Sequence, residues 1–125
     1  MQLKAQNLDD YKWKNRIVLI ISTDENSEDL IEQNKLLETD KEGLKERRLL
    51  LINVLPTKYK LHAHKWESGS KLYDLYNAKK ASFKIILIGL DGGVKLEQMT
   101  PLKKQGLFDI IDTMPMRRAE LRDKN

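Results

Sequence analysis

Three nearly unbroken apolar runs constrain the fold of this chain more than any other feature. They are residues 17–21, 49–55 and 83–88. A strand with one face in water alternates apolar and polar residues, whereas a strand buried on both faces reads as a continuous apolar run. The runs therefore predict a central sheet with helices on both of its faces. Each run is far shorter than the roughly 20 residues that a transmembrane helix needs, so no membrane span is expected.

Helical patterns separate these runs. Residues 28–46 carry apolar side chains near helical spacing, which predicts one long amphipathic helix with Ser27 as its N-cap and Gly43 as a weak point. A strand, a helix of more than ten residues and a second strand form a crossover unit, so the first two strands are expected to be parallel. Residues 57–69 show no clear period and are predicted to be a loop, after which Ser70 would cap a short helix.

The C-terminal part predicts a hairpin followed by a helix. Asp-Gly-Gly at residues 91–93 is a turn signal, and the alternating residues 94–97 are expected to return as an edge strand. Thr100 followed by Pro101 predicts the start of a last amphipathic helix. Pro115 is expected to end or kink this helix.

The predicted order is β-α-β-α-β-β-α, which is that of an α/β, thioredoxin-like fold. Its central four-stranded mixed sheet would contain one parallel and one antiparallel pair, flanked by helices. The 125 residues correspond to one domain. We expect a single thioredoxin-like domain over residues 1–125, with an ordered core at about 8–121.

The absence of cysteine excludes several kinds of chemistry. A disulfide scaffold, a thiolate metal site, and dithiol or cysteine-peroxidase catalysis all need the missing side chain. In a thioredoxin-like domain the chemistry usually lies where the first strand meets the first helix, here residues 22–29. The serine and threonine hydroxyl groups of this segment would need an adjacent base to act as nucleophiles, and no such base is evident in the sequence. A non-enzymatic role is the main prediction, and an enzyme of unknown reaction that uses the 22–29 loop is the alternative.

No metal or cofactor is predicted. Asp24, Asn26 and Glu28 alternate as calcium ligands do, but the pattern lacks the central glycine and the distal glutamate. Helix capping and solvation explain these residues better. His62 and His64 are the only histidines, and a zinc site needs three or four ligands. The Asp-Gly-Gly turn joins two strands and does not open a helix, which argues against a phosphate cradle.

The charge of the chain is unevenly distributed around its net value of +4. Residues 24–47 carry nine acidic and four basic side chains, whereas residues 48–104 carry eleven basic and four acidic ones. A lysine-rich surface of this kind usually keeps a protein soluble. The more specific alternative is that Lys58, Lys60 and Lys65 bind an anionic polymer. Specific nucleic-acid recognition is not expected, because arginine forks and clustered stacking aromatics are missing from this half.

The C-terminal charges allow two interpretations. Asp112 and Glu120, with Arg117 and Arg118, are predicted to form a salt-bridge network that ties the last helix to the body of the protein. The alternative is an anion site built on the two arginines.

The aromatic residues also allow two interpretations. Trp66 is predicted to anchor its loop on the body of the protein. Tyr11 and Trp13, together with Tyr76, could instead line a small-ligand pocket.

Four stretches of the sequence carry a family resemblance. They are LDDYKWKNRIVLI at 8–20, ERR at 46–48, FKIILIGLDGGVK at 83–95 and LFDIIDTMPMRRAE at 107–120. Together they resemble the bacterial domain of unknown function also called P-DUDES, which is related to a domain of secreted vertebrate proteins with sushi repeats and of other matrix-associated proteins. The resemblance covers nearly the whole chain. It implies a thioredoxin-like fold, usual export and no established activity. For the vertebrate relatives an adhesive or binding role has been suggested.

Together these observations predict an exported, non-enzymatic binding or accessory domain. Because the resemblance implies export, we expect a periplasmic or secreted location. Residues 1–6 lack the continuous apolar core of a signal peptide, so we expect that this sequence does not include the signal peptide. A cytoplasmic location is the alternative. The expected partner is an unknown protein or an acidic glycan, and the oligomeric state is left open.

Overall fold

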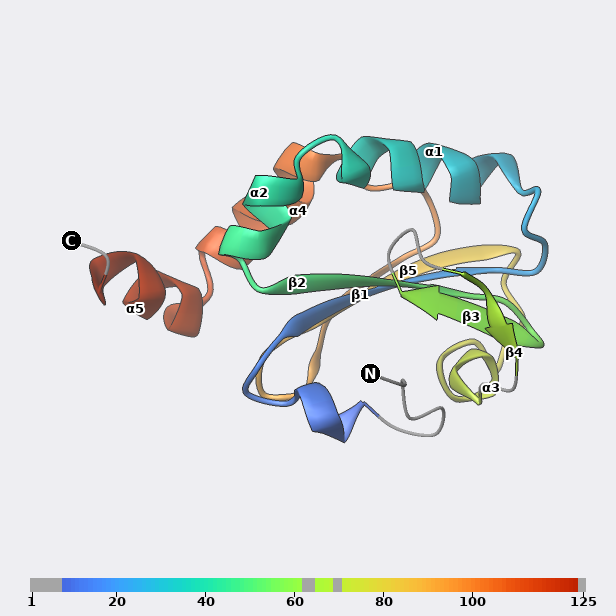
Figure 1. The fold of residues 1–125 in the computed structure, drawn as a ribbon, viewed down its shortest axis with the longest axis horizontal. Helices are drawn as coiled ribbons and strands as arrows, with labels where there is room; N and C mark the ends of the chain where they lie inside the picture. Colours follow the sequence, from blue (N-terminus) through green and yellow to red (C-terminus); the bar gives the residue numbers. More distant parts are fainter. Residues whose placement is uncertain (1–7, 62–64, 69–70, 124–125) are drawn as a thin grey trace.

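The computed structural model describes residues 8–61, 65–68 and 71–123. It is a mixed α/β fold with a six-stranded mixed sheet in the order β4-β3-β2-β1-β5-β6 (Figure 1). The strands are β1 (Arg16–Ser22), β2 (Leu49–Val54), β3 (Lys58–Leu61), β4 (Glu67–Ser68), β5 (Phe83–Ile88) and β6 (Val94–Gln98). The helices are the 3-10 helix η1 (Asp9–Tyr11) and the α-helices α1 (Glu28–Glu38), α2 (Lys41–Glu46), α3 (Leu72–Tyr76), α4 (Lys104–Asp112) and α5 (Pro115–Asp123).

β1 is buried along its whole length, as its apolar run predicts. Its side chains alternate between two cores. Val18 and Ile20 belong to the core under α1, α2 and α4. Ile17 and Leu19 belong to the opposite core, which α3 and η1 cover. The continuous apolar sequence therefore fills two cores from one strand.

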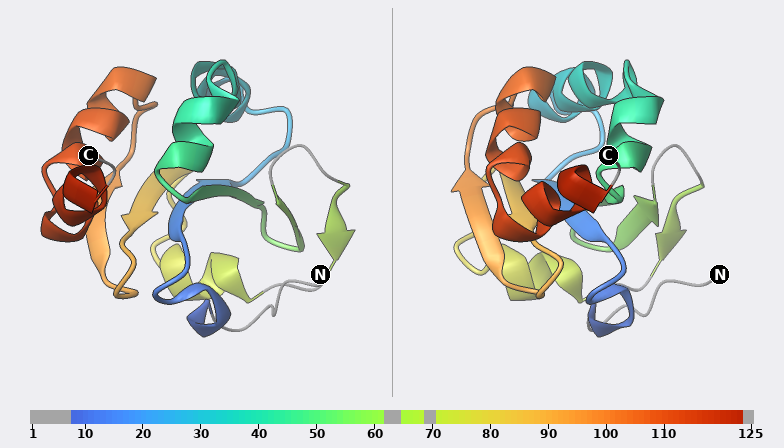
Figure 2. Two further views of the ribbon diagram at one scale, coloured as in Figure 1. Left: turned by 60° about the vertical axis from the view of Figure 1, so that its left-hand side comes forward. Right: turned by 90° about the vertical axis from the view of Figure 1, so that its left-hand side faces the viewer.

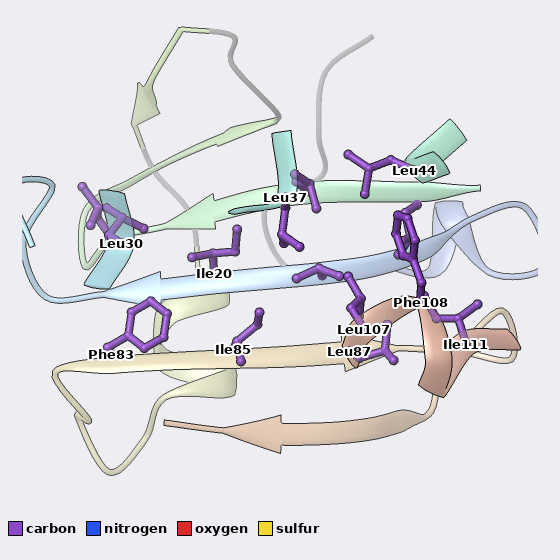
Figure 3. Packing of buried hydrophobic residues seen from close by; sticks show 14 residues of the cluster. Ile20, Leu30, Leu37, Leu44, Phe83, Ile85, Leu87, Leu107, Phe108 and Ile111 are labelled. Atoms are coloured by element: carbon purple, nitrogen blue, oxygen red, sulfur yellow. The ribbon is translucent and has the colours of Figure 1, made fainter. Parts of the chain in front are cut away.

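The two helical layers differ in extent. Figure 1 shows α1, α2 and α4 above the sheet, with α3 and η1 below it, and Figure 2 shows the same sandwich from two further sides. In Figure 3, Leu30 and Leu37 of α1 and Phe108 of α4 point toward the sheet residues of the larger core. The helices thus keep water from both faces of the central strands.

The strand directions agree with the predicted crossover and hairpin. β1 pairs in parallel with β2, whereas β5 is antiparallel to both β1 and β6. The β5–β6 turn places Gly92 at a φ of 84°, a conformation that glycine adopts without a steric penalty. The amide N–H of Gly93 and the ammonium of Lys95 hydrogen-bond the Asp91 carboxylate, and they hold the pKa of that carboxyl below its ordinary value.

The prediction of four strands and of a loop over residues 57–69 was wrong. β3 pairs antiparallel with β2, and β4 pairs with β3, so the sheet extends by two strands on this side. β3 alternates lysines with Tyr59 and Leu61 over only four residues, which is too short to show a period in the sequence. His62 and His64 lie outside the described residues.

The single helix predicted over 28–46 is in fact two helices. α1 ends at Glu38, and Asp40 opens α2 by accepting a hydrogen bond from the Gly43 amide at 2.9 Å. The side chain of an aspartate at this position satisfies an N–H that has no partner within the helix. The break therefore falls at Asp40, three residues before the glycine that the sequence marks as weak.

The predicted start of the last long helix at Thr100 was also wrong, because α4 begins at Lys104. The buried side chain of Gln33 on α1 explains the delay. Its amide donates to the Leu102 carbonyl at 2.8 Å and accepts from the Leu102 N–H at 2.6 Å. Both backbone groups of this residue are thereby bound to another helix, and Lys103 follows in an extended conformation.

The predicted short helix is present as α3, and Ser70, its predicted cap, lies outside the described residues. Pro115 interrupts the C-terminal helix as expected, since α4 ends at Asp112. It then occupies the first position of α5, where its missing N–H costs nothing. The helix α5 that it opens runs to Asp123.

We predict that Gly43→Ala destabilises the protein by about 1–2 kcal/mol. A Cβ at residue 43 would lie 2.6 Å from Oδ2 of Asp40, which caps α2, and 2.7 Å from Cε2 of Phe108 on α4, so the capping carboxylate and the buried ring would both have to shift. This cost exceeds the gain of about 1 kcal/mol in helix propensity. Denaturant unfolding at neutral pH measures the change.

Gly106→Ala is the matched control. It gains the same helix propensity, and its Cβ would lie 3.3 Å from the flexible end of Leu102. This variant is expected to be as stable as the parent or slightly more so. Equal stabilities of the two variants would contradict the role given to Gly43.

Candidate functional site

The structure places the residues singled out in the sequence at three separate positions. Lys58, Lys60 and Lys65 lie on or beside the β3–β4 hairpin. Arg117 and Arg118 lie on α5, near the C-terminus of the chain. Tyr11 and Trp13 lie in or next to η1.

The β3–β4 hairpin holds two ammonium groups beside one indole ring. Nζ of Lys58 lies 5.1 Å and Nζ of Lys60 lies 4.8 Å from the centroid of the Trp66 ring. Both distances are within the range in which the negative face of a tryptophan attracts a cation. Trp66 is half-buried and packs on the larger core, so this ring is fixed to the body of the protein, as predicted.

The same hairpin contacts the loop between β1 and α1. Lys58 forms an ion pair of 2.9 Å with Glu25 of that loop. Lys65 is exposed directly before Trp66. We call Lys58, Lys60 and the Trp66 ring, together with the adjoining Lys65, the Trp66 site.

The side chains of the 22–29 loop hold the loop together. The Ser22 hydroxyl donates to the Asp24 carbonyl at 2.8 Å, and the Asp24 carboxylate accepts from the Asn26 N–H at 3.0 Å. Ser27 caps α1 by accepting from the Leu30 amide, as the sequence predicts. These contacts are those of a turn and a helix cap.

Arg117 lies in a partly buried network of three arginines and three carboxylates. It is 1% exposed, and its guanidinium contacts the carboxylates of Asp112, Glu120 and Glu46. Arg16, equally buried, donates to both oxygens of Glu120 at 3.2 and 3.3 Å. The formal charges of the network balance, so Arg117 brings no net positive charge to the surface.

Arg47 completes this network. It donates to both oxygens of Asp112 at 2.9 and 3.1 Å, and its guanidinium stacks 3.9 Å from the centre of the Phe108 ring. Arg118, by contrast, is exposed on α5. The network ties α5 to β1 and α2, which is the structural role predicted for Asp112, Glu120 and Arg117.

A small cavity lies between η1 and the β5–β6 turn. Its volume is about 110 Å³, and Tyr11 and Tyr76 are among its lining residues. Burial, and then the neighbouring Asp10, raise the pKa of Tyr11. Trp13 does not line the cavity, and it is 57% exposed. Its backbone N–H donates to the Leu90 carbonyl. The cavity is smaller than the 300–1,000 Å³ of typical small-molecule sites.

The described residues bring no three His, Asp or Glu side chains into a group that could hold a metal ion. Among residues 8–61, 65–68 and 71–123, no helix is both long and apolar enough to cross a bilayer.

Comparison with known families places the chain in one of them. The model of a family described as a domain of unknown function, DUF4174, matches residues 7–120. The chain belongs to this family. No curated protein and no solved structure matches it.

Membership of the DUF4174 family confirms the prediction of a domain of unknown function. The matched residues 7–120 include nearly all of the fold described above. The six-stranded sheet is consistent with a thioredoxin-like arrangement, extended by β3 and β4. The relation to vertebrate sushi-repeat proteins stays a prediction. No catalytic or ligand-binding residue follows from the family description.

We predict that the network makes the stability of this DUF4174 domain sensitive to acid. Burial alone would raise the pKa of Asp112, but the hydrogen bonds and charges of Arg47 and Arg117 outweigh it and hold the pKa below its ordinary value. A carboxyl with a lowered folded-state pKa stabilises the fold above its unfolded pKa and loses this effect as the pH falls through the folded pKa. Asp112→Asn should cost about 1–2 kcal/mol at pH 7 and weaken the dependence of stability on pH below about 4.

Asp109→Asn is the control on the same helix. Asp109 is exposed and bonds only its neighbour Gln105 among the contacts described. This variant should unfold like the parent at each pH. If Asp112→Asn retains the full acid dependence of the parent, then the network does not act as described.

Proposed function

We propose that this chain is an exported, non-enzymatic binding domain whose Trp66 site binds an anionic polymer of the acidic-glycan class. The observation that carries the proposal is the placement of two ammonium groups beside one tryptophan ring. Lys65 is exposed and directly precedes Trp66 in the sequence.

The electrostatics of the Trp66 site favour a ligand with several negative charges. Two ammonium groups repel each other when they are held close together. The quadrupole of the indole ring offsets this repulsion, because its face is negative. An acidic glycan offers regularly repeated carboxylate or sulfate groups, which can neutralise neighbouring lysines at the same time. The ring therefore supports a site in which the charges are in place before the ligand binds.

The other cationic candidate is less suited to this role. Arg117 is buried and contacts three carboxylates, so a ligand anion would have to displace them inside the protein. Lys58 of the Trp66 site is paired with a single carboxylate, that of Glu25, in a partly exposed ion pair. Arg118 is exposed and adds one positive charge to the surface of α5. For this reason the proposal is centred on the β3–β4 hairpin.

The non-enzymatic part of the proposal is supported by the 22–29 loop. Its hydroxyl and carboxylate groups act as caps and turn contacts, with Ser22, Asp24 and Ser27 each bound to backbone groups. An enzyme that uses this loop would need a base beside one of these hydroxyls. Export is supported by the family resemblance alone.

We expect Lys58→Gln combined with Lys60→Gln to weaken retention on immobilised heparin. Loss of two partly exposed ion pairs corresponds to about 1 kcal/mol, or about a fivefold increase in Kd. The double variant should therefore elute at a lower salt concentration than the parent. Isothermal titration with a heparin oligosaccharide at low salt gives the corresponding Kd.

Lys35→Gln combined with Lys103→Gln is the matched control. Both lysines are exposed, on α1 and before α4, so this variant loses the same formal charge at other positions. Its retention should stay close to that of the parent. Equal losses in the two double variants would show that net charge alone governs retention, and the Trp66 site would then be wrong.

The ring itself is tested by Trp66→Phe and Trp66→Leu. Phenylalanine keeps an aromatic face, whereas leucine keeps only apolar packing. We expect retention on heparin to fall in the order parent, Trp66→Phe, Trp66→Leu. Two variants that fold normally and bind as the parent does would remove the indole ring from the proposal.

A further inference from the structure

A groove separate from the Trp66 site runs between α3 and the β5–β6 ladder. Its volume is about 520 Å³, within the range of small-molecule sites. Leu75 at one wall is 59% exposed, and Met99 at another is 56% exposed. Single exposed apolar side chains are normal on a protein surface, whereas apolar side chains that line one groove together often mark a binding site.

A buried lysine forms part of the lining of this groove. Lys84 is only 5% exposed, and its ammonium contacts Oε1 of Glu97 at 2.7 Å and the carbonyl oxygen of Tyr76 at 3.2 Å. An ammonium has three N–H donors. Two of them thus have acceptors in the part of the chain that the structure describes.

The contact with Tyr76 gives Lys84 a structural role at the C-terminal end of α3, where a positive charge is favourable. That role alone does not explain a buried charge, because an apolar side chain in such a position is often equally stabilising. Lys79 lies on the rim of the same groove. The two lysines and Glu97 give the groove one excess positive charge beside two apolar walls.

We infer that this groove binds a small amphipathic anion, with its apolar body between Leu75 and Met99 and its acidic group at Lys84. The remaining donor of Lys84 and the charge of Lys79 complement a carboxylate or sulfonate. Glu97 limits the affinity, since its own carboxylate already occupies the ammonium. The acidic group of the ligand and Glu97 therefore compete for the same cation.

Two fluorescent probes of similar size test this inference. 8-Anilinonaphthalene-1-sulfonate carries the sulfonate, and N-phenyl-1-naphthylamine is its uncharged counterpart. Leu75→Ser combined with Met99→Ser should lower the affinity for both probes about tenfold, which is the loss expected when apolar contacts are removed. Glu97→Gln should raise the affinity for the sulfonate probe about fivefold, which corresponds to the free energy of one partly exposed ion pair. The affinity for the neutral probe should not change. Lys84→Met should abolish the preference for the sulfonate.

Ile31→Ser is the control, because Ile31 is an exposed apolar residue on α1 outside the groove. It should bind both probes as the parent does. Circular dichroism confirms that each variant is folded, and Glu97→Gln decides the charge question if Lys84→Met does not fold. The inference is overturned if the groove variant binds both probes normally, or if Glu97→Gln changes neither probe. The Trp66 site contains none of the groove residues, so the outcome of the probe experiment is separate from that of the heparin experiment.

Discussion

The burial of β1 on both faces is the constraint on which the rest of the structure depends. Alternate side chains of this one strand enter two different cores, so neither face of the sheet can remain in water. The chain meets this requirement by sending α1, α2 and α4 to one face and α3 with η1 to the other (Figure 1). The interior of the sheet sandwich is therefore almost entirely apolar, with hydrogen-bonded Gln33 and Asn53 among its few buried polar side chains.

The central strands were predictable because they depend on local composition, whereas several boundaries were not. The start of α4 depends on Gln33, which lies 69 positions from the Leu102 backbone groups that it binds. The buried Asn53 of β2 interrupts an apolar run and pairs with Asn34 of α1 at 2.7 and 3.2 Å. Such contacts join elements that are far apart in the sequence, and neither spacing nor propensity reports them.

The same distinction applies to the candidate sites. The lysines of the Trp66 site stand out by composition, but the approach of Lys58 and Lys60 to one ring depends on a hairpin whose strands of four and two residues are too short to show a period. In the arginine network, Asp112, Glu120 and Arg117 are close in sequence and were predicted together. Arg16 was missed, because it lies 104 positions from Glu120. An arginine directly before an apolar strand is the only sequence signal that could have identified it.

The attachment of α5 has a thermodynamic consequence. Arg117 is the one buried residue of this helix among those described, so charges hold it in place and apolar area contributes little. The heat capacity of unfolding comes mainly from exposed apolar surface. Detachment of α5 would therefore change the heat capacity very little, whereas loss of the sheet would change it strongly. The attachment of α5 is therefore expected to depend mainly on pH and salt concentration, whereas the stability of the sheet is expected to depend mainly on temperature.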